Sequence, residues 1–148
     1  MPIDLDGTDL DWFAVDVDGH LAHFTSGGSR VVPAKVVASE SDLERATVML
    51  RALPMIGKAK ICFRAPGIID TWIDMAKRGL FSYDFISEDN NYFEKGHYRL
   101  IARPESPVRI ESLDPLLQKA LPSFRAPGLC FQKVDRVTQE MLKSMEGE

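Results

Sequence analysis

The stretch Asp11-Trp-Phe-Ala-Val-Asp-Val-Asp-Gly-His-Leu-Ala-His-Phe-Thr25 decides the fold, because two apolar segments with strand-forming residues flank one turn dipeptide. Asp18-Gly19 readily takes the positive φ angles of a two-residue type I′ turn. This pattern predicts an antiparallel β-hairpin over about residues 11–25. With a two-residue loop, the cross-strand pairs are Val17 with His20, Val15 with Ala22, and Phe13 with Phe24.

Alternation along the two strands gives the hairpin an apolar face and a mixed face. The apolar face, which we expect to meet the core, holds Phe13, Val15, Val17, Ala22 and Phe24. The mixed face holds Trp12, Ala14, Asp16, Leu21, His23 and Thr25.

Helical and extended patterns alternate after the hairpin. Ser41 and Glu44 form a capping box that predicts a helix over about 42–52, and a second apolar stripe over 69–76 ends at Gly79. Further helices are expected after Ser112 and from about Asp135, with strands at 80–86, 97–103 and 108–110. The chain is thus predicted to form one α+β domain over residues 1–148, a mostly antiparallel sheet packed with three to four helices.

Size and charge narrow the classes of function. The 148 residues are 45% hydrophobic and 27% charged, which is typical of one globular domain, and no apolar run approaches the ~20 residues of a membrane span. The N-terminus lacks the pattern of an export signal, so we expect a cytoplasmic protein. A net charge of −4 disfavours nucleic acid as a partner. Aspartates crowd the first 18 residues, and no Lys or Arg precedes Arg30, which suits a basic partner surface or a solvated end.

The cysteines and histidines do not indicate a metal site by their spacing. Cys62 and Cys130 each lie in an apolar run, which favours buried thiols, and neither has a Cys or His at zinc-site spacing. The three histidines are scattered along the chain. We therefore expect no metal and no cofactor.

The segment from Phe13 to Leu21 resembles the first motif of haloacid dehalogenase-type phosphatases, in which an apolar strand precedes Asp-x-Asp-Gly. The resemblance implies Asp16 as the nucleophile and Asp18 as the acid/base, both at Mg²⁺. However, His20 replaces the usual Thr, and residues 20–25 continue as a strand where that family has a loop and a helix. A small Mg-dependent phosphatase-like hydrolase is the alternative hypothesis for the function. Because of these departures from the motif, we favour a hairpin over a phosphatase motif for this segment.

Two further sets of residues are candidates for a site. His23 lies diagonal to Asp16 on the mixed face of the predicted hairpin, close enough for an acid/base pair, although a half-exposed strand histidine is the commoner case. The aromatic residues around Tyr83, Tyr92 and Tyr98 have the composition of a recognition surface, but strand cores use the same residues. The candidate binding residues are Trp12, Asp16, His23 and Tyr92.

Several segments together resemble a widespread family of small, uncharacterised bacterial proteins, some of which are similar to immunity proteins encoded beside secreted toxins. These segments are Asp11-Trp-Phe-Ala-Val-Asp16 with Asp18-Gly19, Phe24-Thr-Ser-Gly-Gly28, Pro33, and Tyr98-Arg-Leu-Ile-Ala-Arg-Pro104. The resemblance implies a non-enzymatic protein-binding domain of the immunity type, which masks a toxin domain through an acidic and aromatic surface. An exposed strand edge would also allow a homodimer.

Overall fold

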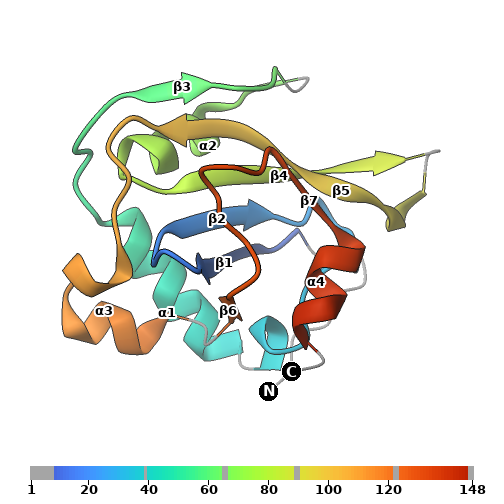
Figure 1. The fold of residues 1–148 in the computed structure, drawn as a ribbon, viewed down its shortest axis with the longest axis horizontal. Coiled ribbons are helices and arrows are strands. Elements are labelled where there is room, and N and C mark those ends of the chain that lie inside the picture. The colour runs from blue at the N-terminus through green and yellow to red at the C-terminus, as the bar shows by residue number, and fades with distance from the viewer. Residues whose placement is uncertain (1–8, 39, 65–66, 89–90, 122–123, 147–148) are drawn as a thin grey trace.

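The computed structural model describes residues 9–38, 40–64, 67–88, 91–121 and 124–146, with their side chains except those of 91–94 and 144–146. Within these ranges seven strands form one mixed, mostly antiparallel sheet, so the α+β class is as predicted (Figure 1). The strands are β1 (Asp11–Asp16), β2 (Leu21–Thr25), β3 (Ala59–Ile61), β4 (Phe81–Glu88), β5 (Asn91–Pro104), β6 (Arg125–Ala126) and β7 (Arg136–Thr138). The helices are α1 (Glu40–Arg51), α2 (Asp70–Lys77), α3 (Pro115–Ala120) and α4 (Gln139–Glu146), with short 3₁₀ turns η1 (Val36–Ala38) and η2 (Ile110–Ser112).

The sheet follows the order β3-β5-β4-β2-β1-β6, and β7 pairs with β5 beside this path. Two of the pairings are parallel, β2 with β4 and β1 with β6, and the others are antiparallel. The long strand β5 shares its outer edge between β3 and β7. The sheet ends in strands of three and two residues, which offer few unpaired backbone groups to a second copy of the chain.

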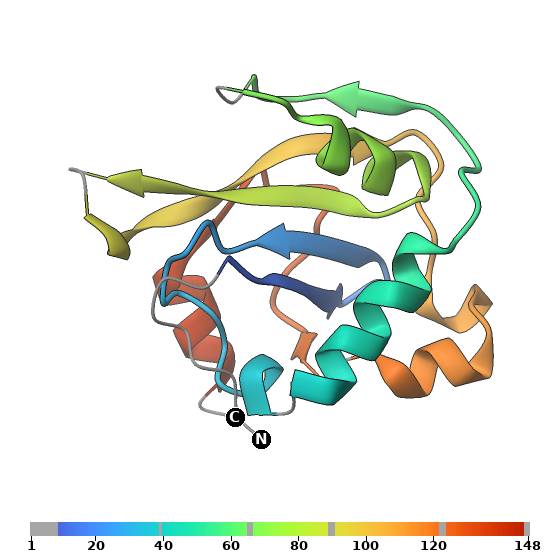
Figure 2. The ribbon, with the colours of Figure 1, turned by 180° about the vertical axis from the view of Figure 1, so that it is seen from behind.

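Both faces of the sheet are covered. Helices α1, α2 and α3 lie on one face, whereas the stretch between β6 and β7 (127–135) and α4 lie on the other (Figure 1 and Figure 2). The indole N–H of Trp72 in α2 donates to Thr25 Oγ1 at 3.1 Å, and the hydroxyl of Tyr83 donates to the carbonyl of Val134 at 2.8 Å on the opposite face. The hairpin is therefore buried on both faces, and the prediction of a single core face is wrong.

The predicted hairpin is confirmed, but its loop has three residues rather than two. Asp16 N–H donates to the carbonyl of His20 at 3.0 Å, and Gly19 N–H donates to the carbonyl of Asp16 at 3.1 Å. Gly19 has a φ of 82°, so a type I turn is closed by one left-handed residue. The predicted Val17–His20 pair is wrong, because Val17 lies in the loop with an exposed side chain.

The longer loop shifts the register by one residue. Phe13 lies opposite His23, so the predicted pairs of Phe13 with Phe24 and Val15 with Ala22 are also wrong. Because side chains alternate, this shift turns every β2 side chain to the other face of the sheet. The helix-covered face now holds Phe13, Val15, Leu21 and His23, and the other holds Trp12, Ala14, Ala22 and Phe24.

An aromatic cluster fills the face opposite the helices. The rings of Trp12 and Phe24 stack with centroids 4.1 Å apart, and Phe24 stacks on Tyr83 at 4.9 Å. Tyr98 stands edge-on to Trp12, accepts a hydrogen bond from its indole N–H at 3.1 Å, and donates to the carbonyl of Val31. Such ring pairs contribute about 0.5–1.5 kcal/mol each beyond the area that they bury. These aromatic residues therefore belong to the core.

The helices deviate from the predictions mainly at their starts. Helix α1 begins at Glu40, so Ser41 lies inside the helix and the predicted capping box is wrong. Helix α3 is capped by Asp114, whose carboxylate accepts the N–H of Leu116 at 2.8 Å, rather than by Ser112. No helix in the described ranges combines the length and apolar character needed to cross a membrane.

Two segments near the C-terminal end form other structures than predicted. The last helix, α4, starts four residues after Asp135, because Arg136–Thr138 pairs with β5. The predicted strand at 108–110 is wrong as well, since Arg109 forms only an isolated bridge to His20 before the turn η2.

Helix α2 and its predicted end at Gly79 are confirmed. Gly79 has a φ of 102°, and the N–H groups of Gly79 and Leu80 donate back to the carbonyls of Ala76 and Met75. A Cβ atom at Gly79 would lie 2.6 Å from Val108 Cγ1 and 3.1 Å from the carbonyl oxygen of Ser106. Both the positive φ angle and the close contacts with Val108 and Ser106 therefore favour glycine at the end of this helix.

We expect Gly79→Ala to lower the free energy of unfolding by about 3 kcal/mol, since it adds a clash to the cost of a positive φ. Gly67→Ala is the matched control, because Gly67 has a φ of 90° but no described atom within 4 Å of its added Cβ. The control should lose only about 1–2 kcal/mol. Urea denaturation measures both, and equal losses would show that Val108 and Ser106 give way without cost.

Candidate functional site

Asp16 ends β1, and backbone N–H groups surround its carboxylate. Oδ1 accepts the N–H groups of Asp18 and His20, each at 2.9 Å, and Oδ2 accepts the N–H of Phe131 at 2.8 Å. The side chain has no exposed surface. Hydrogen bonds to a charged group are each worth about 1.5–3 kcal/mol, so Asp16 joins the hairpin loop to a segment 115 residues later in the chain.

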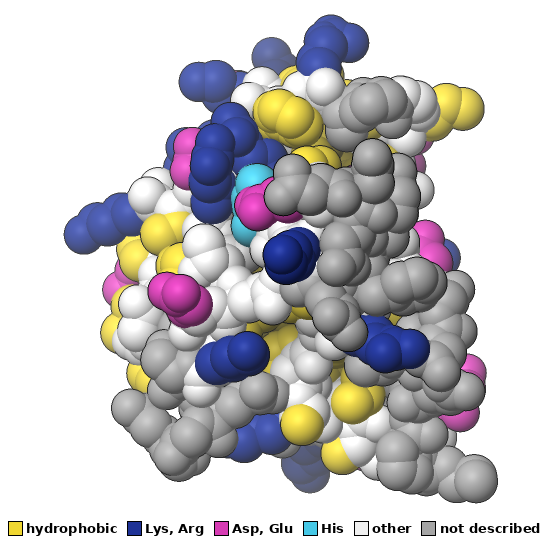
Figure 3. Space-filling model, turned by 90° about the vertical axis from the view of Figure 1, so that its right-hand side faces the viewer, with side chains coloured by type: hydrophobic (Ala, Val, Ile, Leu, Met, Phe, Trp, Pro, Cys, Tyr) yellow, Lys and Arg dark blue, Asp and Glu magenta, His cyan; other side chains and the backbone are white. Residues whose placement is uncertain are grey.

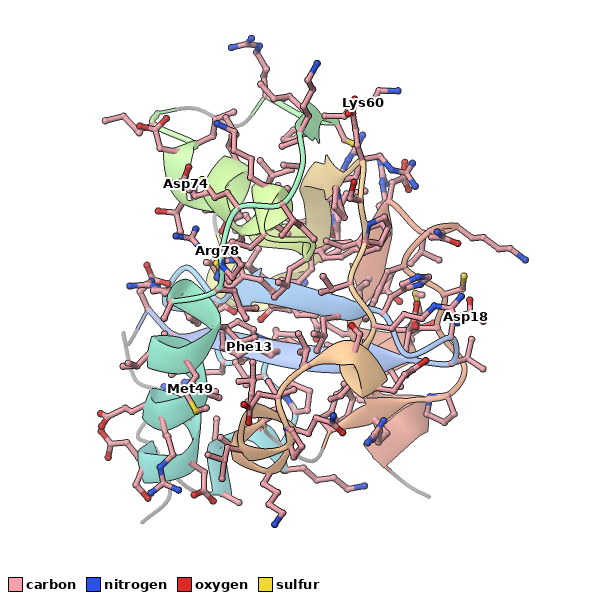
Figure 4. The ribbon with its side chains drawn as sticks, turned by 90° about the vertical axis from the view of Figure 1, so that its left-hand side faces the viewer. Phe13, Asp18, Met49, Lys60, Asp74 and Arg78 are labelled. Atoms are coloured by element: carbon pink, nitrogen blue, oxygen red, sulfur yellow. The ribbon has the colours of Figure 1, made fainter. Side chains whose placement is uncertain are left out.

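Asp18 and Cys130 meet on the outer side of this loop. Figure 4 shows Asp18 at the tip of the hairpin, at the other end of the strands from α1. The thiol of Cys130 donates to Asp18 Oδ2 at 3.3 Å, and burial together with this hydrogen bond raises the pKa of Cys130. One ligand atom from each of Asp16, Asp18 and Cys130 lies within 4.8 Å of the others.

The prediction of two buried cysteines is wrong. Cys130 is partly exposed beside Asp18, and Cys62 is exposed at the end of β3. An apolar stretch of three residues is too short to indicate which side of a loop or edge strand faces the core.

His20 lies beneath the same loop and is 4% exposed. Its ring is tilted against that of Phe81, with the centroids 5.9 Å apart. Its Nδ1 atom lies 3.9 Å from Asp16 Oδ2, which is too long for a hydrogen bond, and it has no hydrogen-bond partner among the described residues. A buried polar atom in this state calls for an explanation in terms of a water molecule or an ion.

His23 lies on the helix-covered face, so its predicted pairing with Asp16 is wrong. The one-residue shift in register puts the two side chains on opposite faces of the sheet. His23 Nδ1 is 2.7 Å from Ser82 Oγ, and Nε2 is 3.3 Å from Asp11 Oδ2, which also accepts a hydrogen bond from Arg51 at 2.6 Å. Burial raises the pKa of the Asp11 carboxyl, but the interactions with His23 and Arg51 lower it by more, so the net pKa lies below its usual value.

Ser82, His23 and Asp11 thus form a triad with the residue types of a serine hydrolase. Ser82 has no exposed surface and lies within β4, where no substrate carbonyl can reach its hydroxyl. The contacts of this triad therefore satisfy the hydrogen-bonding needs of its own buried polar groups, and the triad is not set up for catalysis. Ser82 is 59 residues from His23, and only the parallel pairing of β2 with β4 brings the two together.

A second polar network on this face joins β2, β4 and α2. Thr25 Oγ1 donates to Asp84 Oδ1 at 2.6 Å and accepts the indole N–H of Trp72 at 3.1 Å. Burial raises the pKa of Asp84, although the hydrogen bond from Thr25 opposes this effect. These contacts hold α2 against the sheet.

An open groove of about 480 Å³ runs between α1 and the start of β1. We call it the acidic groove, because its described lining residues include Asp9, Asp11, Glu40 and Glu44 but a single cation, Arg51, which Asp11 already pairs with. Apolar side chains of Leu43 and Val48 also line it, and that of Val48 is 69% exposed. The groove thus combines negative charge with accessible apolar surface.

A second hollow of about 490 Å³ lies beside α4, on a side of the molecule that carries both basic and acidic side chains (Figure 3). Its charges are mixed, with Lys95, Arg136 and Lys143 beside Glu88 and Glu140. His97, another lining residue, lies 3.3 Å from Glu88 and is largely buried there. These opposing charges do not favour a ligand of either sign.

The two aromatic candidates have different outcomes. Trp12 is fully buried in the aromatic cluster, so its side chain offers no surface to a partner in this structure. Tyr92 lies on β5, but its side chain is outside the described part of the chain.

No family model, curated protein or solved structure matches this chain. Its function therefore has to be inferred from the arrangement of its own residues.

We expect Asp16→Asn to lower the free energy of unfolding by about 3 kcal/mol, because an amide N–H₂ would face at least one of the three backbone donors and the charge would be lost. Asp18→Asn is the matched control, since Asp18 is exposed and accepts only the Cys130 thiol among the contacts described. Urea denaturation followed by circular dichroism measures both variants. Equal stability of the two would contradict a structural role for Asp16.

Proposed function

We propose that this chain is a non-enzymatic protein-binding domain of the immunity type, which covers a basic surface of its partner with the acidic groove. The observation that carries the proposal is the lining of the groove, where the described residues supply four carboxylates against one arginine that is already paired. A cationic segment of a partner is the chemistry that complements such a lining.

The arrangement of the groove supports contact with a protein. Glu40 and Glu44 lie one helical turn apart on α1, so a basic side chain can interact with both. Val48 lies one further turn along the helix and offers exposed apolar surface next to the charges. Protein interfaces typically combine an apolar centre with a polar rim.

The acidic character extends beyond the groove itself. Asp4 and Asp6 precede Asp9 in the sequence, outside the described residues, and no Lys or Arg occurs before Arg30. The negative potential of this end should therefore speed the encounter with a basic partner, and it should do so less at high salt. The aromatic part of the predicted surface is not part of this proposal, because Trp12, Tyr83 and Tyr98 are buried.

The phosphatase alternative gains no support from the geometry. Attack on phosphorus needs an accessible carboxylate oxygen, whereas the Asp16 side chain is fully buried and holds three backbone N–H groups. The residues after Gly19 continue as β2, where the resemblance requires a loop and a helix.

The test is binding to the purified products of the genes that flank the gene of this protein, measured by isothermal titration calorimetry at two salt concentrations. We expect a complex whose affinity falls as salt rises, and Glu44→Lys should weaken it by about 10-fold or more, since it places a like charge against the basic segment. Glu105→Lys is the matched control, because Glu105 is exposed but does not line the groove.

Two results would contradict this proposal. One is the absence of a complex between the purified proteins at both salt concentrations. The other is an equal loss of affinity in the Glu44 and Glu105 variants, which would show that only net charge matters and that the groove does not hold the partner.

A further inference from the structure

We propose that Asp16, Asp18 and Cys130 bind a divalent metal ion of the zinc class at the tip of the hairpin. The site is separate from the acidic groove, since Asp16 ends β1 whereas Asp11 begins it. The proposal therefore does not depend on the proposed function.

The spacing of the three side chains suits such an ion. Their ligand atoms lie within 4.8 Å of one another, and Cys130 Sγ already lies 3.3 Å from Asp18 Oδ2. Tetrahedral zinc, with Zn–O of about 2.0 Å and Zn–S of about 2.3 Å, places two oxygen ligands and one sulfur ligand roughly 3.3–3.5 Å apart. Movement of the side chains of Asp18 and Cys130, which both reach the surface, by about an ångström is the kind of adjustment that closes this difference.

Asp16 has one acceptor position left for an ion. A carboxylate oxygen carries two lone pairs. Oδ1 uses both for the N–H groups of Asp18 and His20, whereas Oδ2 uses one for the N–H of Phe131. The same three hydrogen bonds hold the carboxylate in a fixed orientation, which is how supporting contacts usually position a metal ligand.

His20 supplies an independent observation. Its Nδ1 atom is buried, lacks a hydrogen-bond partner among the described residues and is 3.9 Å from the same Asp16 Oδ2 atom. Leaving a buried polar atom without a partner costs about 1–3 kcal/mol. An ion on the remaining lone pair of Oδ2 carries water molecules of its own, and one of these would give Nδ1 the partner that the protein does not provide.

The donor set selects the class of metal. Magnesium and calcium prefer sites made of oxygen atoms alone, whereas a thiolate ligand favours zinc and similar transition metals. Cys130 binds as the thiolate and releases its proton to solvent when the ion enters. The site would thus tie the hairpin loop to a segment 112 residues away, as a structural zinc ion does in other small domains.

Spacing along the chain predicts no metal site, because no second Cys or His lies near either cysteine. The fold supplies a different neighbourhood, because Phe131 N–H bonds to Asp16 and thereby brings Cys130 to Asp18.

The test uses the full chain, freed of metal by a chelator and titrated with Co²⁺ and then Zn²⁺. Co²⁺ is the probe because thiolate ligation gives a charge-transfer absorption in the near ultraviolet. We expect one ion to bind per chain with this absorption, Zn²⁺ to displace Co²⁺, and excess Mg²⁺ to leave it in place.

Three variants locate the ion. Cys130→Ser should abolish the charge-transfer absorption, and Asp18→Asn should weaken binding by about 10–100-fold. Cys62→Ser is the matched control, since it removes the other thiol of the chain, and it should bind as the unmodified protein does. Zinc should also raise the thermal unfolding midpoint of the unmodified protein and of Cys62→Ser, but not that of Cys130→Ser.

The proposal is overturned if the unmodified chain binds neither ion, or if Cys130→Ser keeps the absorption. It is also overturned if Mg²⁺ displaces Co²⁺ readily, because the site would then be one for a hard cation. Circular dichroism of Cys130→Ser and Asp18→Asn separates loss of the site from loss of the fold, since both side chains reach the surface.

Discussion

The buried carboxylate of Asp16 is the interaction on which the arrangement of this chain most depends. Three backbone N–H groups, those of Asp18 and His20 at the hairpin turn and that of Phe131, all converge on its two oxygens. A charged group that is removed from water must be compensated by close donors, so the loop and the 131 segment cannot separate without exposing it. The shape of the loop, the position of Cys130 and the cover over the aromatic cluster all follow from this contact.

The same strand carries the two regions to which we assign roles. At its start, Asp11 interacts with His23 and Arg51 at the edge of the acidic groove. At its end, Asp16 meets the loop and Cys130. Between them, Trp12 and Phe13 are buried on opposite faces of the sheet, so the strand is packed on both sides. Charged groups at both ends of one well-packed strand are thus held without flexible loops to place them.

Local sequence patterns anticipated the elements better than their relationships. The hairpin, α2 and β4 carry strong signals of their own, in a turn dipeptide, a helical stripe and a run of β-forming residues. The predicted register is wrong because Asp18-Gly19 suits a three-residue loop as well as a two-residue one. Only the contacts of Asp16 select between the two loops. Strands β6 and β7 have two and three residues, too few for alternation to be recognised. The contacts of His23 with Ser82 and of Cys130 with Asp18 join residues far apart in the chain, which no local pattern reports.

The cover over the aromatic face has a consequence for synthesis of the chain. The hairpin and β4 are made early, yet Phe124 and Phe131, which pack against Trp12, Phe24 and Tyr83, are made late. During translation these aromatic rings lack the residues that cover them until the C-terminal part of the chain leaves the ribosome. An exposed aromatic sheet is a target for chaperones and for aggregation, so the nascent chain must be protected longest at the part of the protein that is most firmly buried once folding is complete.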